Sequence, residues 1–227
     1  MRKIIVMMLA CALLMGCSGG LLRPKIEQGI EKALPSYIGP ARSYDVKASG
    51  SETDMLGGRI SSLHITGTDA QIAQGLTVAL LVVEMDDVSF NTSNRKLKSV
   101  GSTAFQATMT EKAVNEYINA SRPDGSQMLI ELEAGKLTVV ARPTFHGVGA
   151  EFRVTGQPQI KGATKVNFVA DKASLSIVPV PAWIVNRLLD RVNPVLDLEK
   201  MKYPVKIASV SVKKDAVQLG GGMVFKP

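Results

Sequence analysis

The feature that most constrains the fold of this chain is a change of hydrophobic period after Pro40. Residues 24–37 place apolar side chains on one face of a helix and charged side chains on the other. From Tyr44 onward apolar and polar residues alternate instead, which is the pattern of a strand with one buried face. Helical spacing returns only at residues 111–120 and 181–192. Because helices do not alternate regularly with strands, we expect an α+β fold whose sheet is antiparallel.

Turn residues separate the alternating segments and mark the ends of the expected strands. We expect strands near residues 44–48, 63–65, 76–85, 100–109, 128–133, 137–141, 151–155, 165–169, 173–178, 205–212 and 216–219. The sequence shows no internal repeat and no low-complexity linker. Residues 23–227 are therefore expected to form a single α+β domain.

The segment at residues 76–85 is unusual because both of its faces are apolar. A strand of this kind must be covered on both sides, or one side must line a space that an apolar ligand fills. We therefore expect lipid-facing side chains on one face of this strand and its neighbours. The expected set is Leu80, Val82, Phe90 and Phe105. A slip of one residue would exchange the two faces.

The N-terminus has the composition of an export signal. Two basic residues precede the apolar residues 4–15, a run too short to cross a bilayer, which needs roughly 20 residues. The run ends in the sequence LMGC at residues 14–17, which resembles a bacterial lipobox. A lipoprotein signal peptidase needs a small residue before the cut, and only the thiol of Cys17 can accept the diacylglycerol. We expect residues 1–16 to be removed and residues 17–22 to form a lipidated, palmitate-carrying cysteine and its tether.

The rest of the composition fits a protein at a membrane surface. The net charge is +7, and Cys11 in the signal is the only cysteine besides Cys17, so no disulfide is expected. An exported, lipid-anchored protein rarely meets nucleic acid, so anionic headgroups are the expected partners of its basic groups. Candidate membrane contacts are Arg95, Lys96 and Lys98 at a hairpin tip and Trp183, the only tryptophan, on the third helix. The alternatives are a charged tip that keeps the hairpin soluble and a tryptophan that packs against the preceding strand end.

The chain supplies few residues for catalysis or metal binding. His64 lies within an expected strand and His146 in a turn, and no serine occupies a nucleophile elbow. Glu84, Asp86 and Asp87 form the densest acidic cluster, but they lack the spacing of a metal-binding loop. We interpret this cluster as a solvated strand end. We expect no catalytic residue, no metal site and no cofactor.

Four stretches together resemble the LmeA-like phospholipid-binding family of bacterial envelope proteins. They are the N-terminal amphipathic helix, MLGGR at residues 55–59, MTE at residues 109–111 followed by Val114 and Asn115, and LDL at residues 196–198 before Pro204 and Val205. The resemblance spans nearly all of the chain after the signal. It implies a fold related to the TULIP type, in which a long, curved antiparallel sheet rolls around amphipathic helices and leaves an apolar groove. It also implies a phospholipid ligand and offers no catalytic residues.

The sequence therefore predicts a lipid-anchored protein of the bacterial cell envelope that binds phospholipid or a similar amphiphile in an apolar groove. It would face the periplasm or another extracytoplasmic space and serve lipid trafficking or envelope maintenance. Ser18 after Cys17 favours the outer membrane in a cell with two membranes. One alternative is an interaction module with a solid core that assists an envelope enzyme as its partner protein. A less favoured alternative is a hydrolase that uses His64, Asp86 or Asp87.

Overall fold

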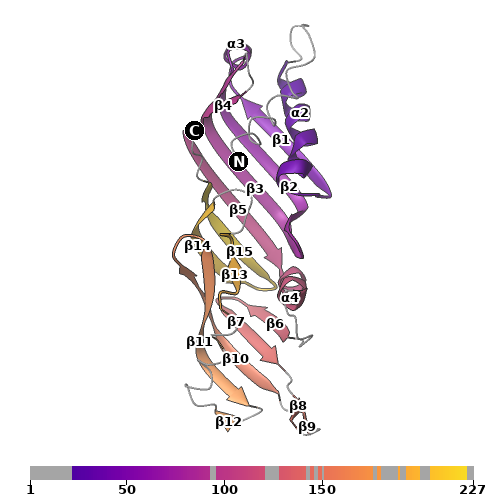
Figure 1. Cartoon of the computed structure of the whole chain (residues 1–227), viewed down its shortest axis with the longest axis vertical. Helices are drawn as coiled ribbons and strands as arrows, with labels where there is room; N and C mark the ends of the chain where they lie inside the picture. Colours follow the sequence, from indigo (N-terminus) through magenta and orange to yellow (C-terminus); the bar gives the residue numbers. More distant parts are fainter. Residues whose placement is uncertain are drawn as a thin grey trace. The chain divides into compact units, whose positions relative to one another are not determined.

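The computed structural model describes residues 22–92, 96–120, 128–141, 144–145, 148–149, 151–175, 178–179, 189, 193–199 and 205–223. These residues form two compact units, which are described separately (Figure 1). The first unit contains the described parts of Met1–Ala73, Val78–Ala107 and Gly222–Pro227, and the second contains those of Gln74–Thr77 and Thr108–Gly221. The single domain expected for residues 23–227 stays a prediction.

Short helices and long strands make up both units. The described helices are α2 (Leu22–Tyr37), α3 (Glu52–Leu56) and α4 (Glu111–Ala120). The longer strands are β1 (Ser43–Ser49), β2 (Arg59–Ala73), β3 (Leu76–Asn91), β5 (Ser102–Thr110), β6 (Met128–Glu133), β7 (Lys136–Ala141), β10 (Phe152–Lys161), β11 (Lys165–Leu175), β14 (Val205–Lys213) and β15 (Ala216–Met223). The shorter strands are β4 (Lys96–Ser99), β8 (Thr144–Phe145), β9 (Val148–Gly149), β12 (Val178–Pro179) and β13 (Leu196–Asp197).

The strands pair in an antiparallel manner within each unit. In the first unit they follow the order β1-β2-β3-β5, and β4 pairs with the end of β3. In the second unit a six-stranded sheet has the path β12-β11-β10-β7-β6, with β13 paired to β11, while β14 and β15 are neighbours in another sheet. One sheet is strongly curled into a half-barrel. The expected α+β class with a long, curved antiparallel sheet is therefore confirmed.

Two of the three expected helices are present, as α2 and α4. The third, at residues 181–192, lies outside the described residues except for Leu189. The prediction of a separate strand at residues 173–178 is wrong, because β11 continues to Leu175. A register shift between β10 and β11 leaves Asp171 as a bulge in β11. Asp171 and Lys172, a polar pair that is typical of a turn, therefore lie inside one strand.

Helix α2 covers the first unit through one apolar stripe. Ile26, Ile30 and Leu34 lie about one helical turn apart, and each is at most 1% exposed. They pack the helix against β1 (Figure 1). Burial of side chains of this size contributes roughly 1.5–3 kcal/mol each. The stripe predicted from the sequence is thus the face that holds α2 in place.

Helix α2 also protects an edge strand with two carboxylates. Glu27 Oε1 accepts a hydrogen bond from the amide of Ala48 at 2.8 Å, and Glu31 Oε1 accepts one from the amide of Val46 at 3.2 Å. Alternate amides of an edge strand point away from its paired neighbour and lack a strand partner. Four residues of a helix rise about 6 Å, and two residues of a strand span about 6.8 Å. The spacing of the two carboxylates along α2 therefore nearly matches the spacing of the two amides along β1. The helix therefore replaces the missing strand beside β1.

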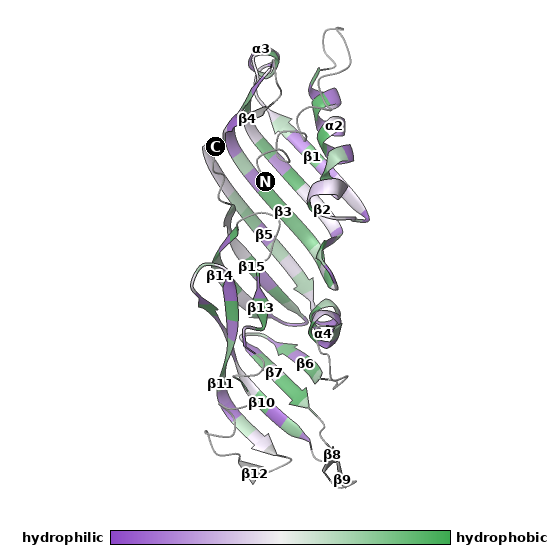
Figure 2. Ribbon diagram, in the orientation of Figure 1, coloured by the Kyte–Doolittle hydropathy of each residue, from purple (hydrophilic) through white to green (hydrophobic). Residues whose placement is uncertain are grey.

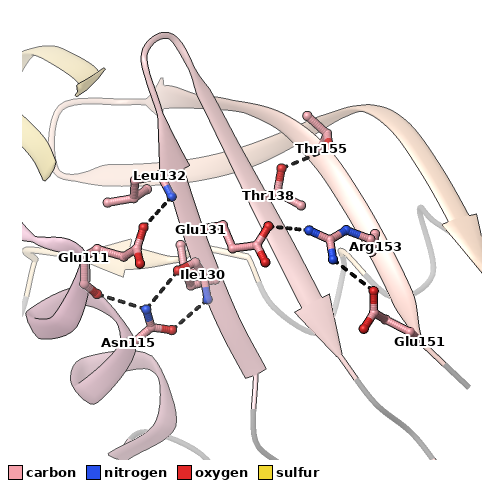
Figure 3. A network of polar contacts seen from close by, with 9 residues as sticks. All are labelled: Glu111, Asn115, Ile130, Glu131, Leu132, Thr138, Glu151, Arg153 and Thr155. Atoms are coloured by element: carbon pink, nitrogen blue, oxygen red, sulfur yellow. Dashed lines mark hydrogen bonds and ion pairs between the residues drawn. The ribbon is translucent and has the colours of Figure 1, made fainter. Parts of the chain in front are cut away.

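Helix α4 repeats this arrangement on β6, the edge of the six-stranded sheet (Figure 3). Three alternate amides of β6 donate to side-chain oxygens four residues apart on α4. The pairs are Met128 to Asn119 (2.9 Å), Ile130 to Asn115 (2.6 Å) and Leu132 to Glu111 (2.7 Å). Each asparagine also donates to the carbonyl of its own β6 partner at 2.9 Å. Side chains of α4 thus bind the backbone amides and carbonyls at the edge of this sheet.

The alternation of buried and exposed residues along β3 changes phase between Val83 and Val88. Leu81 and Val83 are buried in the middle of the strand, whereas Val88 and Phe90 are buried at its end. Between these pairs Asp87 has a φ of 51°, in the left-handed region. A left-handed residue inside a strand is typical of a β-bulge, which moves every following side chain to the opposite face. By contrast, regular alternation of hydrophobic and hydrophilic positions is visible along β10 and β14 (Figure 2).

Candidate functional site

The second unit contains an apolar cavity between α4 and the strands around it. Sixteen of the described residues line it, and the hydroxyl of Tyr117 is the only polar side-chain group among these sixteen. Helix α4 contributes Val114, Tyr117 and Ile118. The other lining residues are Leu76, Met109, Met128, Ile130, Leu137, Val139, Pro158, Val166, Val195, Leu196, Val210, Val217 and Leu219.

The lining divides into a deep floor and a more exposed rim. Ile130 and Val166 are at most 3% exposed and belong to the floor. The three α4 residues are only half-buried. Half-buried side chains also occur at the other margins, at Met128, Pro158, Val195 and Val210. Half-buried residues therefore form a rim that includes the α4 side of the cavity.

The cavity has a volume of about 70 Å³. That is less than half of the roughly 150 Å³ that an apolar cavity needs to hold benzene. Typical pockets for small molecules measure about 300–1,000 Å³. An acyl chain can therefore enter only if the walls move apart, and the movement must occur at the half-buried rim rather than at the close-packed floor.

The attachment of α4 differs from that of α2, because it is mostly polar. Ala113 is the only residue of α4 that is fully buried. Five side-chain hydrogen bonds join α4 to the edge of β6. The cavity lies under the apolar side of the helix, where Val114 and Ile118 are half-buried. Helix α4 is thus fixed firmly along β6 and packed loosely over the cavity.

A charged cluster lies beside the cavity near Tyr117. Lys165 Nζ is 2.7 Å from Glu199 Oε2 and 3.6 Å from Asp197 Oδ2. These carboxylates raise the pKa of Lys165, mainly through the hydrogen bond to Glu199. Burial raises the pKa of Tyr117, and the negative charge of Asp197 raises it further. Tyr117 is therefore a neutral phenol at physiological pH, and the lining residues that the structure describes carry no charge.

The four residues expected to face lipid all belong to the first unit. Phe90 and Phe105 are 4% and 8% exposed and form part of its core. Leu80 is 43% exposed, and Val82 is half-buried. None of the four lines the cavity of the second unit. Their contact with lipid stays a prediction, and the cavity is a separate candidate site that sequence reasoning missed.

The expected anchor and membrane contacts are only partly described. Cys17, Arg95 and Trp183 lie outside the described residues. Lys96 begins β4 opposite Asn91, and Lys98 is exposed on the same strand. The roles of these residues at a membrane stay predictions. Within the described part of the chain, no helix is long and apolar enough to cross a bilayer.

The histidine considered for catalysis lies on an open sheet surface in the first unit. His64 Nδ1 is 3.5 Å from Glu84 Oε1, and His64 Nε2 is 3.3 Å from Thr66 Oγ1. The side chains of His64 and Glu84 are 45% and 62% exposed, so both are largely open to solvent. His146 lies outside the described residues.

The acidic cluster of the first unit has a structural use. Asp86 Oδ2 accepts a hydrogen bond from Ser102 Oγ at 2.7 Å, and the Asp86 carbonyl accepts one from the amide of Gly101 at 3.0 Å. The neighbouring Asp87 forms the bulge in β3. Among the described residues, no group of three potential metal ligands is found. Because β3 continues past these residues to Asn91, the interpretation of the cluster as a strand end is wrong. Asp86 instead joins β3 to the first residue of β5.

Comparison with known proteins gives one significant result. A family model described as LmeA-like phospholipid-binding matches residues 19–222. No curated protein sequence and no solved structure matches the chain significantly. The matching family is defined by phospholipid binding and is not an enzyme family.

Proposed function

Because the chain belongs to the LmeA-like phospholipid-binding family, we propose that it takes the acyl part of a phospholipid, or of a similar amphiphile, into the apolar cavity of the second unit. The single observation that carries this proposal is the lining of the cavity, where the sixteen described residues include no charged side chain. An uncharged, apolar lining suits hydrocarbon and excludes a phosphate group. The headgroup would remain outside, at the half-buried rim.

The driving force would be the removal of acyl methylenes from water. Each buried methylene contributes about 0.8 kcal/mol, so a chain of several methylenes offsets the cost of moving the cavity walls apart. Such binding requires no bond to be made or broken. We therefore propose that the protein is not an enzyme and carries its ligand without a cofactor.

Helix α4 is the wall that we propose moves. Its hydrogen bonds lie along the edge of β6, so the helix can rotate about that edge while Asn115 and Asn119 keep their partners. Rotation would lift Val114, Tyr117 and Ile118 away from the floor and widen the cavity. A packed apolar contact such as that of α2 would resist this movement more strongly, because it would expose buried side chains to water.

We also propose that Cys17 is lipidated after removal of residues 1–16. The protein would then remain at an envelope membrane and face the extracytoplasmic space, where it could move lipids or maintain the envelope. The lipid anchor and the bound lipid would be chemically separate, since one is covalent at Cys17 and the other sits in the cavity. A partner protein of the envelope fits this role as the donor or acceptor of lipid.

The proposal is tested by filling the cavity from α4. Val114→Trp places a large side chain in the cavity from a half-buried position, where the strain of overpacking is lower than at the floor. Glu116→Trp is the matched control, because Glu116 is exposed on the same helix. Lipid that co-purifies with each protein is measured by native mass spectrometry, and folding is checked by circular dichroism.

We expect Val114→Trp to fold and to lose most of its bound lipid, while Glu116→Trp retains lipid at the level of the unaltered protein. Normal lipid content in folded Val114→Trp would contradict the proposed cavity. If the unaltered protein itself carries no lipid and gains none from vesicles, a solid-core interaction module becomes the better account.

A further inference from the structure

Tyr117 is the one described lining residue that joins an apolar ring to a polar group. It belongs to the cavity lining, and its hydroxyl is the only polar side-chain group among the sixteen described lining residues. It lies on α4 one helical turn after the buried Ala113 and is itself half-buried. A tyrosine in such a place turns its apolar ring to the interior and its hydroxyl to the boundary with water.

The surroundings of Tyr117 indicate where its hydroxyl lies. Burial raises the pKa of the phenol, and the charge of Asp197 raises it further, so this carboxylate is near the hydroxyl. Leu196 of β13 pairs with Val166 of β11, and both line the cavity. The next pair along this ladder is Asp197 and Lys165, about 3.4 Å further on. The polar end of Tyr117 therefore lies where the apolar lining meets a charged pair.

Beyond that pair the side chains are charged and open to solvent. Lys165 Nζ lies 2.7 Å from Glu199 Oε2, and the Glu199 side chain is 65% exposed. Asp197 Oδ1 accepts a hydrogen bond from the amide of Glu199 at 2.9 Å, which holds the two acidic residues together. Three zones thus follow one another at this margin of the cavity. They are an uncharged hydrocarbon lining, one phenol, and a group of solvated charges.

The same three zones occur in the same order along a phospholipid. Its acyl chain is apolar, its ester carbonyl accepts hydrogen bonds without donating any, and its headgroup is charged. With the acyl chain in the cavity, the ester lies at the cavity margin, because chain and ester are directly bonded. A carbonyl that leaves water needs a donor in its place. Among the described lining residues, only the side chain of Tyr117 can donate a hydrogen bond.

We propose that the hydroxyl of Tyr117 donates a hydrogen bond to the ester carbonyl of the bound acyl chain, and that the site thereby selects ester-linked over ether-linked lipids. This inference deepens the proposed function and rests on it. An ether-linked chain lacks the carbonyl and cannot accept this bond. A site built around a hydrogen bond discriminates against a ligand that lacks the bonding group. Tyr117 is thus a specificity-determining residue on the wall that moves.

The test offers the protein two lipids that differ only in the carbonyl groups. Vesicles contain equal amounts of a diacyl and a dialkyl phosphatidylethanolamine whose chains have the same length. The purified protein is loaded from these vesicles, and native mass spectrometry gives the ratio of bound ester lipid to bound ether lipid. Because the two lipids compete for the same protein molecules, the ratio does not depend on the fraction of protein that is folded.

The variant Tyr117→Phe removes the hydroxyl and keeps the apolar ring. Tyr44→Phe is the matched control, because half-buried Tyr44 lies in the first unit, donates to the carbonyl of Gly39 at 2.8 Å and does not line the cavity. One hydrogen bond changes a binding constant by about two- to tenfold. We expect the unaltered protein and Tyr44→Phe to favour the ester lipid by such a factor. Tyr117→Phe should bind both lipids about equally and retain the ether lipid at the level of the unaltered protein.

The opposing results are equally specific. Equal amounts of the two lipids on the unaltered protein would overturn the proposal, and so would a preference for the ester lipid that Tyr117→Phe retains. Loss of both lipids from Tyr117→Phe would assign this tyrosine a structural role and overturn the proposal as well. If the unaltered protein binds neither lipid, the proposed function itself fails, so the two failures are distinguishable.

Infrared spectra test the hydrogen bond itself. A diacyl lipid with isotope-labelled carbonyl carbons is bound to each protein, and the frequency of the labelled carbonyl stretch is measured. A hydrogen bond to the carbonyl oxygen lowers this frequency. We expect a lower frequency in the unaltered protein and in Tyr44→Phe than in Tyr117→Phe. The same frequency in all three proteins would overturn the proposal, whatever the amount of lipid bound.

Discussion

The hydrogen bonds between α4 and β6 predict that replacing Asn115 lowers the free energy of unfolding, and that the loss depends on the position along the helix. Its amide donates to the Ile130 carbonyl at 2.9 Å, and its oxygen accepts from the Ile130 amide at 2.6 Å. Ile130 is 1% exposed, so water reaches these backbone groups poorly once the side chain is gone. An unsatisfied buried group costs about 1–3 kcal/mol. Alanine recovers up to about 0.7 kcal/mol through helix propensity. The amide and the carbonyl of Ile130 together lose about 2–6 kcal/mol, so Asn115→Ala should destabilise the protein by roughly 1–5 kcal/mol after the gain in helix propensity.

Asn119→Ala provides the matched control for this value. Asn119 makes the same pair of hydrogen bonds, but to Met128, which is only half-buried. Water can replace a side chain at this more exposed position, so we expect a loss nearer to 1 kcal/mol. Urea unfolding followed by circular dichroism gives both values. A cost below about 0.5 kcal/mol for Asn115→Ala, or a larger cost for Asn119→Ala, would show that the buried groups of Ile130 do not depend on Asn115.

Three further predictions follow from the residues described above. Because burial and Asp197 raise the pKa of Tyr117, its stabilising contribution is complete below pH about 10 and is lost as the pH rises through the folded-state pKa. Tyr117→Phe should therefore lose less stability than the unaltered protein when urea unfolding is repeated from about pH 9 to about pH 11, and an equal loss in both proteins would contradict this. Cys17→Ser should abolish labelling with radioactive palmitate and release the protein from membranes or leave its signal uncut; continued labelling would exclude the lipobox. Replacing His64 or Asp86 by alanine should leave lipid content and cellular function intact, whereas loss of function at normal abundance would favour a hydrolase.

The helices could be predicted because their pattern is local. The apolar stripe of α2 and the spacing of α4 repeat within a few residues, and each stripe needs only one face to be buried. Glu27 and Glu31 appeared to belong to the solvent face of α2, but they bind the amides of β1. Their spacing of four residues was visible in the sequence. The role of this spacing was not visible, because it depends on an edge strand whose position the sequence does not give.

The cavity could not be predicted because its walls come from distant parts of the chain. Leu76, Met109 and Val217 all line it, although more than a hundred residues separate the first from the last. No local period marks such a set. The bulge at Asp87 is a second obstacle, since it exchanges the faces of β3 partway along the strand. The double-faced strand was correctly recognised as unusual, yet the position of a groove did not follow from it.

Photo-crosslinking can locate the bound acyl chain residue by residue. A phospholipid with a diazirine on its acyl chain is loaded into the purified protein and irradiated, and the modified peptides are identified by mass spectrometry. The account predicts crosslinks to α4 at Val114, Tyr117 or Ile118 and to residues 128–139 of the opposite wall. Crosslinks confined to Leu80, Val82, Phe90 and Phe105 would contradict it and place the lipid in the first unit.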